Sequence, residues 1–232
     1  MGTRLALHAI HQGLGAVFDD RCGWELPLHY GDPEAEHRAV RETAGLIDRS
    51  LAGKVEVTGR DRVSFLQRML TNDLKILEPG RGCPAAFLDA HGKVQTLLSV
   101  FVAGDRLLLE LPPAMAGKTL QLLDKFLISE KVELADVSEA SGGFSLQGPA
   151  AARVLADLTG SPVSLEPYCH EERQADGVAT RIIRVDETGE TGFHCWAPAE
   201  HGPAVWARLL GAAEREAARR GCREMQLDTH SY

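Results

Sequence analysis

A pattern of elements that occurs twice along the chain constrains the fold more than any single residue does. In its first copy, residues 54–58 (KVEVT) alternate polar and apolar side chains as a half-buried strand does, and Gly59 separates them from a helical stretch at residues 60–70. In its second copy, residues 143–147 (GFSLQ) form the strand, and Gly148 precedes the next apolar helical stripe. The second glycine lies 89 positions after the first.

The later part of each copy is a strand-like hairpin followed by a proline and a helix, at residues 94–111 and again at residues 180–197. Pro112 and Pro198, which precede the two helices, lie 86 positions apart. The order strand, helix, strand, strand, helix, strand is the split βαβ arrangement. The predicted fold is therefore α+β, with two pseudo-repeated split-βαβ (ferredoxin-like) units and mainly antiparallel sheets. An ordinary α+β sandwich without a repeat gives the same periodicities and stays an alternative at this point.

The repeat also predicts the domain organisation. A chain of 232 residues can form one large domain or two of about 115 residues each. We expect an N-terminal segment with one helix at residues 1–50, a first α+β unit at 51–138, and a second at 139–232. Because pockets favour interfaces between repeats, the ligand site is expected between the two units.

Composition narrows the function classes. With 44% hydrophobic and 25% charged residues, the chain is typical of a soluble globular protein. It contains neither an apolar run of the roughly 18–20 residues that cross a bilayer nor a signal-peptide core, so we expect a cytoplasmic protein without a membrane partner. A net charge of −8 opposes nucleic-acid binding, and glutamates interrupt the one arginine group, Arg215, Arg219, Arg220 and Arg223.

Cysteine and histidine spacing predicts neither a metal site nor a catalytic nucleophile. The five cysteines are odd in number and never form a CxxC pair, which is typical of reduced thiols. His194 and Cys195 are adjacent on a predicted strand, so their side chains point to opposite faces and cannot share one ion. The same holds for Cys169 and His170 if they are extended.

Two places carry polar side chains that suit either a structural or a ligand-binding role. Asn72 and Asp73 follow the end of a predicted helix, where they form either a cap with an Asx turn or a set of ligand contacts. Glu110 lies in an otherwise apolar strand, as a carboxylate on the sheet surface or one that faces a ligand cavity.

Four strings of sequence, taken together and in order, resemble the glycine-cleavage T-protein superfamily. They are residues 23–50 (GWELPLHYGDPEAEHRAVRETAGLIDRS), 53–82 (GKVEVTGRDRVSFLQRMLTNDLKILEPGRG), 145–155 (SLQGPAAARVL) and 188–196 (TGETGFHCW). That superfamily includes tetrahydrofolate-dependent aminomethyltransferases and the folate-binding YgfZ-type proteins of iron–sulfur cluster maintenance. The resemblance implies a pseudo-repeated α+β pair with a tetrahydrofolate derivative bound between its halves.

The chain departs from this pattern at the positions that the family uses for chemistry. An acidic pair of the aminomethyltransferases, one member of which assists attack by the folate amine, corresponds to Thr96 and Leu97 here. Whether the protein is an enzyme is therefore left open, and we predict no catalytic residue. In the pterin-gripping segment, the leading tyrosine is replaced by Glu187 and the closing glutamate by His194, while the glycine turn is kept.

The end of the sequence is a third departure. Family members continue into a C-terminal barrel-like domain, whereas residues 227–232 resemble the start of the next element, and Ser231 falls at the position of an arginine that clamps the folate carboxylate. The resemblance thus implies a C-terminally shortened member that lacks the barrel domain. If the face left uncovered is apolar, we expect self-association.

The leading hypothesis is a folate-binding, T-protein/YgfZ-like protein that supports iron–sulfur protein maintenance or one-carbon metabolism, with iron–sulfur proteins as clients. Four polar residues are expected to hydrogen-bond a tetrahydrofolate derivative: Asn72, Asp73, Glu110 and Glu190. One alternative is a divergent tetrahydrofolate-dependent aminomethyltransferase of the glycine cleavage type. The other is a degenerate scaffold that binds no ligand.

Overall fold

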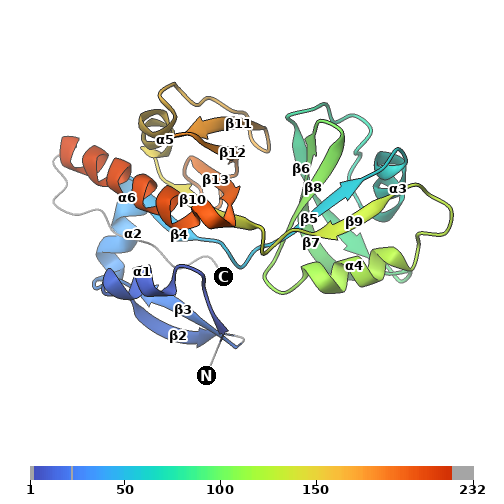
Figure 1. The fold of residues 1–232 in the computed structure, drawn as a ribbon, viewed down its shortest axis with the longest axis horizontal. Helices are drawn as coiled ribbons and strands as arrows, with labels where there is room; N and C mark the ends of the chain where they lie inside the picture. The colour runs from blue at the N-terminus through green and yellow to red at the C-terminus, as the bar shows by residue number, and fades with distance from the viewer. Residues whose placement is uncertain (1–2, 22, 221–232) are drawn as a thin grey trace. The chain divides into compact units, whose positions relative to one another are not determined.

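The computed structural model describes residues 3–21 and 23–220, which fold into two compact units (Figure 1). One unit, here called the discontinuous unit, is built from three stretches of chain: Met1–Ser50, Gly142–Pro167 and Glu172–Tyr232. The other, here called the inserted unit, comprises Leu51–Ser141 and Tyr168–Glu171.

The inserted unit is a five-stranded antiparallel sheet in the order β6-β7-β8-β5-β9 with two helices. Its elements are β5 (Gly53–Thr58), α3 (Arg62–Met69), β6 (Gly82–Leu88), β7 (Val94–Ala103), β8 (Arg106–Leu111), α4 (Ala116–Asp124) and β9 (Glu133–Asp136). Because the side chains of β5 alternate, Val55 and Val57 join the apolar cluster under α3 and α4, while Lys54 and Glu56 lie on the other face. The meander after α3 contains three strands.

Two backbone positions of the inserted unit explain where its helices begin. Gly59 has a φ of +93°, and a Cβ there would lie 2.1 Å from the carbonyl oxygen of Lys131, so only glycine fits between β5 and α3. The sequence predicts that the second helix opens at Pro112, which is wrong, because Ala114 takes a left-handed φ of 61° that helical backbone excludes. The helix α4 begins at Ala116 instead.

The discontinuous unit contains a second five-stranded sheet, in the order β11-β12-β13-β10-β4. Its elements are β4 (Gly45–Asp48), β10 (Ser141–Gln147), α5 (Ala151–Thr159), β11 (His170–Ala175), β12 (Val178–Arg184), β13 (Gly192–Pro198), the 3-10 turn Ala199–His201 and α6 (Gly202–Arg219). Helices α5 and α6 pack on one face of this sheet, around Phe144, Leu146 and Cys195. The edge strand β4 comes from the N-terminal fifty residues and pairs antiparallel with β10.

The same unit holds a small sheet in the order β1-β3-β2, formed by β1 (Thr3–Arg4), β2 (Val17–Arg21) and β3 (Trp24–His29), together with α1 (His8–Gly13) and α2 (Pro33–Glu42). The start of α2 follows from its sequence, since the Asp32 carboxylate accepts hydrogen bonds from the backbone of Glu34 at 3.0 Å and Ala35 at 3.3 Å. Pro33 occupies the first helical position, where its missing N–H is not needed.

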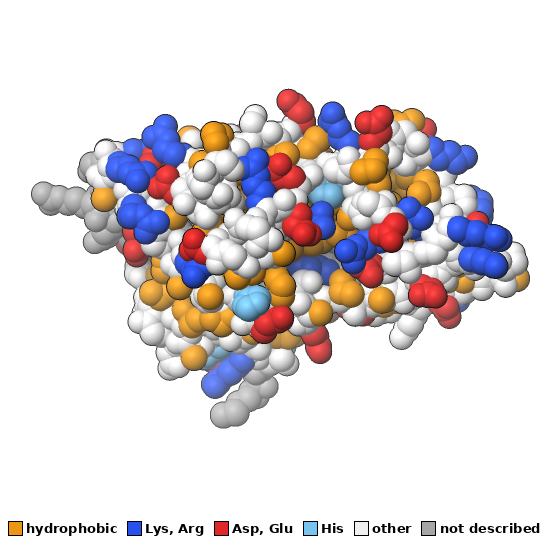
Figure 2. Space-filling view, turned by 45° about the horizontal axis from the view of Figure 1, so that its top comes forward, with side chains coloured by type: hydrophobic (Ala, Val, Ile, Leu, Met, Phe, Trp, Pro, Cys, Tyr) orange, Lys and Arg blue, Asp and Glu red, His pale blue; other side chains and the backbone are white. Residues whose placement is uncertain are grey.

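Charged side chains of both signs are interspersed on the face shown in Figure 2.

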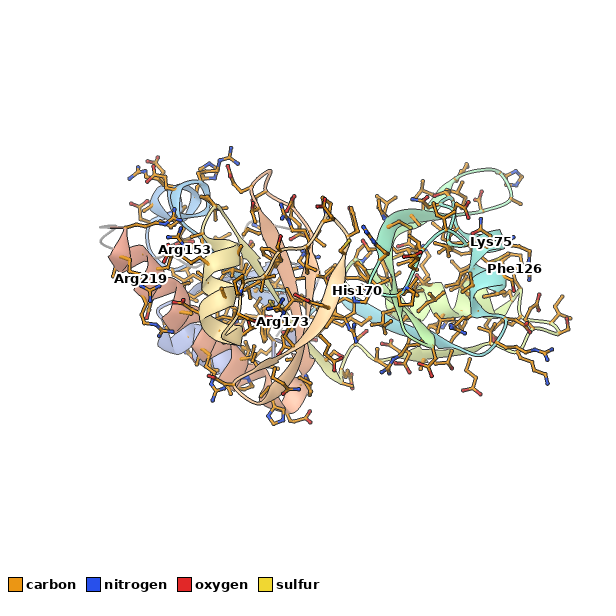
Figure 3. All side chains as sticks on the ribbon, turned by 90° about the horizontal axis from the view of Figure 1, so that it is seen from above. Lys75, Phe126, Arg153, His170, Arg173 and Arg219 are labelled. Carbon is orange, nitrogen blue, oxygen red and sulfur yellow. The ribbon has the colours of Figure 1, made fainter. Side chains whose placement is uncertain are left out.

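In the discontinuous unit, the buried carboxylate of Glu216 on α6 bonds Arg153 of α5 at 2.9 Å and Arg220 at 2.9 Å, and Arg153 and Arg219 are labelled in Figure 3. Burial raises the pKa of Glu216, but these arginines outweigh it and hold that pKa below its usual value. Of the described helices, none is long and apolar enough to span a membrane.

The α+β class with mainly antiparallel sheets is confirmed. The expected end of the second unit, residues 227–232 with Ser231, lies outside the described residues, as do Cys22, Cys222 and Arg223.

Candidate functional site

Each large sheet has one face packed under helices and an opposite face that carries polar side chains. In the inserted unit, the opposite face carries Lys54 on β5, Glu110 on β8 and Ser99 on β7, which are cross-strand neighbours in that order. In the discontinuous unit, the face opposite α5 and α6 carries Ser145, Gln147 and His194, all three of them buried. Burying a polar group costs free energy unless the group is hydrogen-bonded, and ligand sites use a few convergent polar groups. These two faces therefore hold the candidate ligand-binding residues.

Glu110 is buried rather than displayed on the sheet surface. Directly across the ladder from it, the Lys54 side chain is 1% exposed, and its Nζ donates to the carbonyl oxygens of Ala52 and Ser141, each at 3.2 Å. Lys54 and Glu110 are therefore buried cross-strand neighbours of opposite charge on this face of the sheet.

Asn72 and Asp73 form a turn and are both exposed. The Asn72 Nδ2 donates to the carbonyl oxygen of Pro84 at 2.9 Å, and its Oδ1 accepts from the backbone of Asp73 at 2.9 Å. The Asp73 carboxylate accepts from the backbone of Lys75 at 3.1 Å, and Lys75 is labelled in Figure 3. These bonds tie the end of α3 to β6, while both side chains remain accessible to solvent.

The two positions of the family's acidic pair lie on opposite faces of β7. Thr96 is opposite Phe87 of the apolar core and is buried on the helix-covered face, where its hydroxyl donates to the carbonyl oxygen of Leu97 at 3.0 Å. Leu97 is 62% exposed and lies on the same face as Ser99 and Glu110. Of the two positions, only 97 could present a side chain on the polar face.

In the discontinuous unit, the loop between β12 and β13 carries Glu190. Its carboxylate lies 3.3 Å from the Arg41 guanidinium of α2, and the same guanidinium donates to the carbonyl oxygen of Thr188 at 2.9 Å. Arg41 thus fixes both the loop backbone and the orientation of Glu190.

Glu187, on the same loop, stands at the centre of a polar cluster that the sequence did not reveal. Its carboxylate lies 2.8 Å from the Arg49 guanidinium and 3.2 Å from Nε2 of His194, and it accepts from the Ser145 hydroxyl at 3.4 Å. We call these four residues the Glu187 cluster. In the sequence, the signal for this cluster is that Glu187 and His194 both depart from the family pattern.

Gln147 attaches the loop to the sheet beneath the Glu187 cluster. Its Nε2 donates to the Ser145 hydroxyl at 2.8 Å and to the carbonyl oxygen of Val185 at 3.0 Å, and its Oε1 accepts from the backbone of Glu187 at 3.2 Å. A Cβ on Gly192 would lie 2.0 Å from that Oε1, so a larger residue there would displace the Gln147 side chain. Gln147 therefore attaches the start of the loop, at Val185 and Glu187, to β10.

The described cysteines are free thiols in buried positions, Cys83, Cys169 and Cys195. Burial raises the pKa of Cys195 to about 12, so this thiol stays protonated at neutral pH. Cys169 accepts from the Arg81 guanidinium at 3.2 Å, and the neighbouring His170, labelled in Figure 3, bonds the carbonyl oxygen of Val102 at 3.1 Å. Within residues 3–21 and 23–220, no group of three or more His, Cys, Asp or Glu side chains could hold a metal ion.

Comparison with known proteins identifies relatives over nearly the whole chain. An aminomethyltransferase of Anoxybacillus flavithermus is 36% identical over 219 residues, which cover 93% of this chain and 60% of that protein. An aminomethyltransferase of Bacillus subtilis is 32% identical over 217 residues, 92% of this chain and 60% of the relative. The chain thus spans about three fifths of the length of these relatives.

Two solved structures are similar to this chain. The crystal structure of glycine cleavage system aminomethyltransferase T from Bartonella henselae superposes with a TM-score of 0.83 at 29% identity, over 91% of this chain and 58% of that one. A heterotetrameric sarcosine oxidase from Corynebacterium shares the fold at 18% identity and a TM-score of 0.57, over 80% of this chain. The model of the GCVT N-terminal domain matches residues 7–227. The chain therefore belongs to the GCVT N-terminal domain family, and the resemblance to the glycine-cleavage T-protein superfamily is confirmed.

Proposed function

We propose that this chain binds a reduced folate as an aminomethyltransferase-type domain of one-carbon metabolism. The observation that carries the proposal is the match to aminomethyltransferases over 93% of the chain. The similarity to aminomethyltransferases favours the aminomethyltransferase type over a role in iron–sulfur protein maintenance. A reduced folate, when bound, supplies the amine that carries the one-carbon unit.

The polar groups of the described residues suit such a ligand. A pterin ring presents amino and N–H donors, which carboxylates accept well. We assign the four residues that the sequence singled out, Asn72, Asp73, Glu110 and Glu190, as candidate hydrogen-bonding partners of the folate. Asn72 and Asp73 are exposed, and Glu190 is held in place by Arg41, which supports an accessible and oriented set of acceptors.

Calorimetric titration of the protein with 5-formyltetrahydrofolate tests the proposal. We expect saturable binding to one site with a dissociation constant in the micromolar range, a standard free energy of about −8 kcal/mol. p-Aminobenzoylglutamate, which lacks the pterin ring, serves as the control and is expected to bind more weakly. The absence of any heat from 5-formyltetrahydrofolate up to about 1 mM would contradict folate binding.

A second candidate function, folate binding without group transfer in support of iron–sulfur proteins, is favoured by one observation. Of the two acidic-pair positions, position 97 faces the polar side of the sheet, and it is occupied by leucine. The chain therefore has no carboxylate there to take a proton. The chain's residues would then hold and orient the ligand without assisting attack by its amine.

Replacement of Leu97 by aspartate distinguishes the two candidates. A positioned general base contributes about 100-fold or more, so we expect Leu97→Asp to raise the rate of tetrahydrofolate-dependent aminomethyl transfer by about that factor. The rate is measured as consumption of an aminomethyl donor, with Leu97→Asn as the matched control that cannot take a proton. A wild-type rate equal to that of Leu97→Asp would show that transfer proceeds without this carboxylate.

A further inference from the structure

Helix α6 carries a glutamate at a position where its buried neighbours are apolar. The buried stripe of the helix includes Leu209, Ala212, Ala213, Glu216 and Ala217, at the spacing of three and four residues that defines one helix face. Glu216 is 1% exposed. In the sequence, Glu216 interrupts an arginine group, whereas in the structure its carboxylate lies below the surface that these arginines form.

Three arginine side chains converge on this carboxylate. Arg153 Nη1 and Arg220 Nε both lie 2.9 Å from Oε1 of Glu216, and Arg219 Nη1 lies 3.4 Å from Oε2. Arg153 of α5 and Arg219 of α6, both labelled in Figure 3, come from neighbouring helices. We call these three residues the Glu216 arginines. Their side chains are 62%, 55% and 30% exposed for Arg153, Arg219 and Arg220, so their outer parts are accessible.

Stability alone does not account for the buried carboxylate. The desolvation of a buried ion pair offsets most of its attraction, and an apolar residue of similar volume stabilises a helix interface as well or better. Guanidinium groups that lie close together repel one another unless a negative charge between them compensates. Glu216 therefore has a specific effect, which is to hold three positive groups together in fixed orientations.

The Glu216 arginines keep unused hydrogen-bonding capacity. A guanidinium group carries five N–H donors, and among the described residues Arg153 donates to Glu216 alone. Arg219 also donates to Asp157 at 2.9 Å, and Arg220 donates to the last carbonyl oxygen of α2 at 3.2 Å. Three guanidinium groups thus contact two carboxylates, which leaves one positive charge in excess and most of the donors available.

These properties define the partner. Arginines bind carboxylates through paired N–H donors, and clusters of arginines recognise acidic motifs in proteins. Small ligands are instead bound in concave sites that cover most of their surface, whereas these side chains are largely exposed. We propose that the Glu216 arginines form a docking surface for an acidic segment, rich in aspartate and glutamate, of a partner protein.

The charge of the whole chain distinguishes this partner from nucleic acid. The net charge of −8 repels a long polyanion, which extends beyond the three arginines. A short acidic segment is influenced mainly by charges within a Debye length, about 10 Å at 0.1 M salt. Locally the arginines dominate, so a short acidic segment is the better match.

Fluorescence anisotropy with fluorescein-labelled hexaglutamate tests the proposal on the full chain. At low salt we expect saturable binding with a dissociation constant on the order of 100 μM, weakening several-fold at physiological salt. Hexaglutamine with the same label is the control and is expected not to bind. Equal binding of the two peptides, or tighter binding of labelled hexathymidylate than of hexaglutamate, would overturn the assignment of an acidic protein segment.

Single arginine variants locate the binding. Arg153→Gln and Arg219→Gln are each expected to raise the dissociation constant for hexaglutamate about fivefold, since each removes one oriented guanidinium group. Arg208→Gln is the matched control, because Arg208 is an exposed arginine of α6 that pairs with Asp176 at 2.9 Å, outside this cluster. Its affinity is expected to stay within about twofold of the wild type. Wild-type affinity in both cluster variants would overturn the proposal.

The variant Glu216→Gln separates orientation from net charge. It removes a negative charge, so net charge alone would tighten the binding of hexaglutamate, whereas loss of orientation weakens it. We expect the dissociation constant to rise about threefold in a protein whose circular dichroism matches the wild type. If Glu216→Gln does not fold, Asp157→Asn makes the same comparison, because Asp157 orients Arg219. Tighter binding in the folded variant would show that Glu216 builds no docking surface.

Discussion

Replacement of Asp48 by alanine is expected to lower the free energy of unfolding of the discontinuous unit by about 3–5 kcal/mol, the cost of breaking a buried charged network. Asp48, at the end of β4, bonds Nε2 of His11 at 2.9 Å and accepts from the backbone of Ser50 at 2.8 Å. His11 is completely buried, and its Nδ1 lies 2.8 Å from the Tyr30 hydroxyl. A single carboxylate thus anchors groups from α1, β4 and the end of β3.

The geometry of this network indicates which groups share its hydrogen bonds. Because the Asp48 carboxylate only accepts, Nε2 of His11 donates to it, and Nδ1 of His11 shares a hydrogen bond with the Tyr30 hydroxyl at 2.8 Å. Burial, reinforced by the charges of Asp48 and Glu36, raises the pKa of Tyr30, so the hydroxyl keeps the proton that it donates. Without Asp48, the buried His11 N–H and the half-buried donors of Ser50 would lose this acceptor, which is costly.

Urea unfolding followed by tryptophan fluorescence measures this effect. All three tryptophans, Trp24, Trp196 and Trp206, belong to the discontinuous unit, and Trp206 packs edge-on to His11 at 5.0 Å between ring centroids. As a control, Asp19→Ala removes an exposed partner of Arg21 and is expected to cost less than about 0.5 kcal/mol. If Asp48→Ala unfolds within 1 kcal/mol of that control, the network is not a major source of stability.

Lys54→Met is expected to lower the free energy of unfolding of the inserted unit by about 3–5 kcal/mol, because it leaves the buried carboxylate of Glu110 without the ammonium across the ladder. Methionine preserves most of the volume and length of the lysine stem, so the loss of charge dominates. The carbonyl oxygens of Ala52 and Ser141 also lose a donor.

Amide hydrogen exchange in peptides from β5 and β8 provides the measurement, since the inserted unit holds no tryptophan. The exposed Lys75→Met is the control, for which wild-type protection is expected. The double variant Lys54→Met/Glu110→Gln removes both charges and is expected to recover at least half of the lost protection. Wild-type exchange in Lys54→Met would show that the buried ammonium is dispensable.

Local sequence patterns predict those elements whose side chains alternate or whose ends carry strong signals. The alternation of β5, with Val55 and Val57 facing the core, and the Asp32-Pro33 start of α2 are examples. The strands β2 and β3 were not predicted, because β3 combines buried and half-buried positions without alternation and contains Pro27. By contrast, β13 was predicted as part of the hairpin at residues 180–197, although it is buried at six consecutive residues, from Gly192 to Ala197, and so has no period-two pattern.

Some residues of the candidate site are likewise visible in the sequence, and others are not. Sequence alone singled out Glu110 and the turn at Asn72 and Asp73, because a carboxylate in an apolar strand and adjacent polar residues after a helix stand out locally. It did not single out Lys54 as the partner of Glu110. That pairing depends on the register of β5 against β8, which no local pattern encodes.

By itself, the sequence determined the α+β class, the family and the departures at positions 96, 97, 187 and 194. Only the tertiary structure decided that Leu97 rather than Thr96 faces the polar side of β7, and that Glu187 meets His194 and Arg49. The physical reason is that strand residues alternate between faces, so a shift of one position in register would exchange the two faces. Which face a side chain takes, and which distant segment it meets there, depends on the packing of the whole sheet.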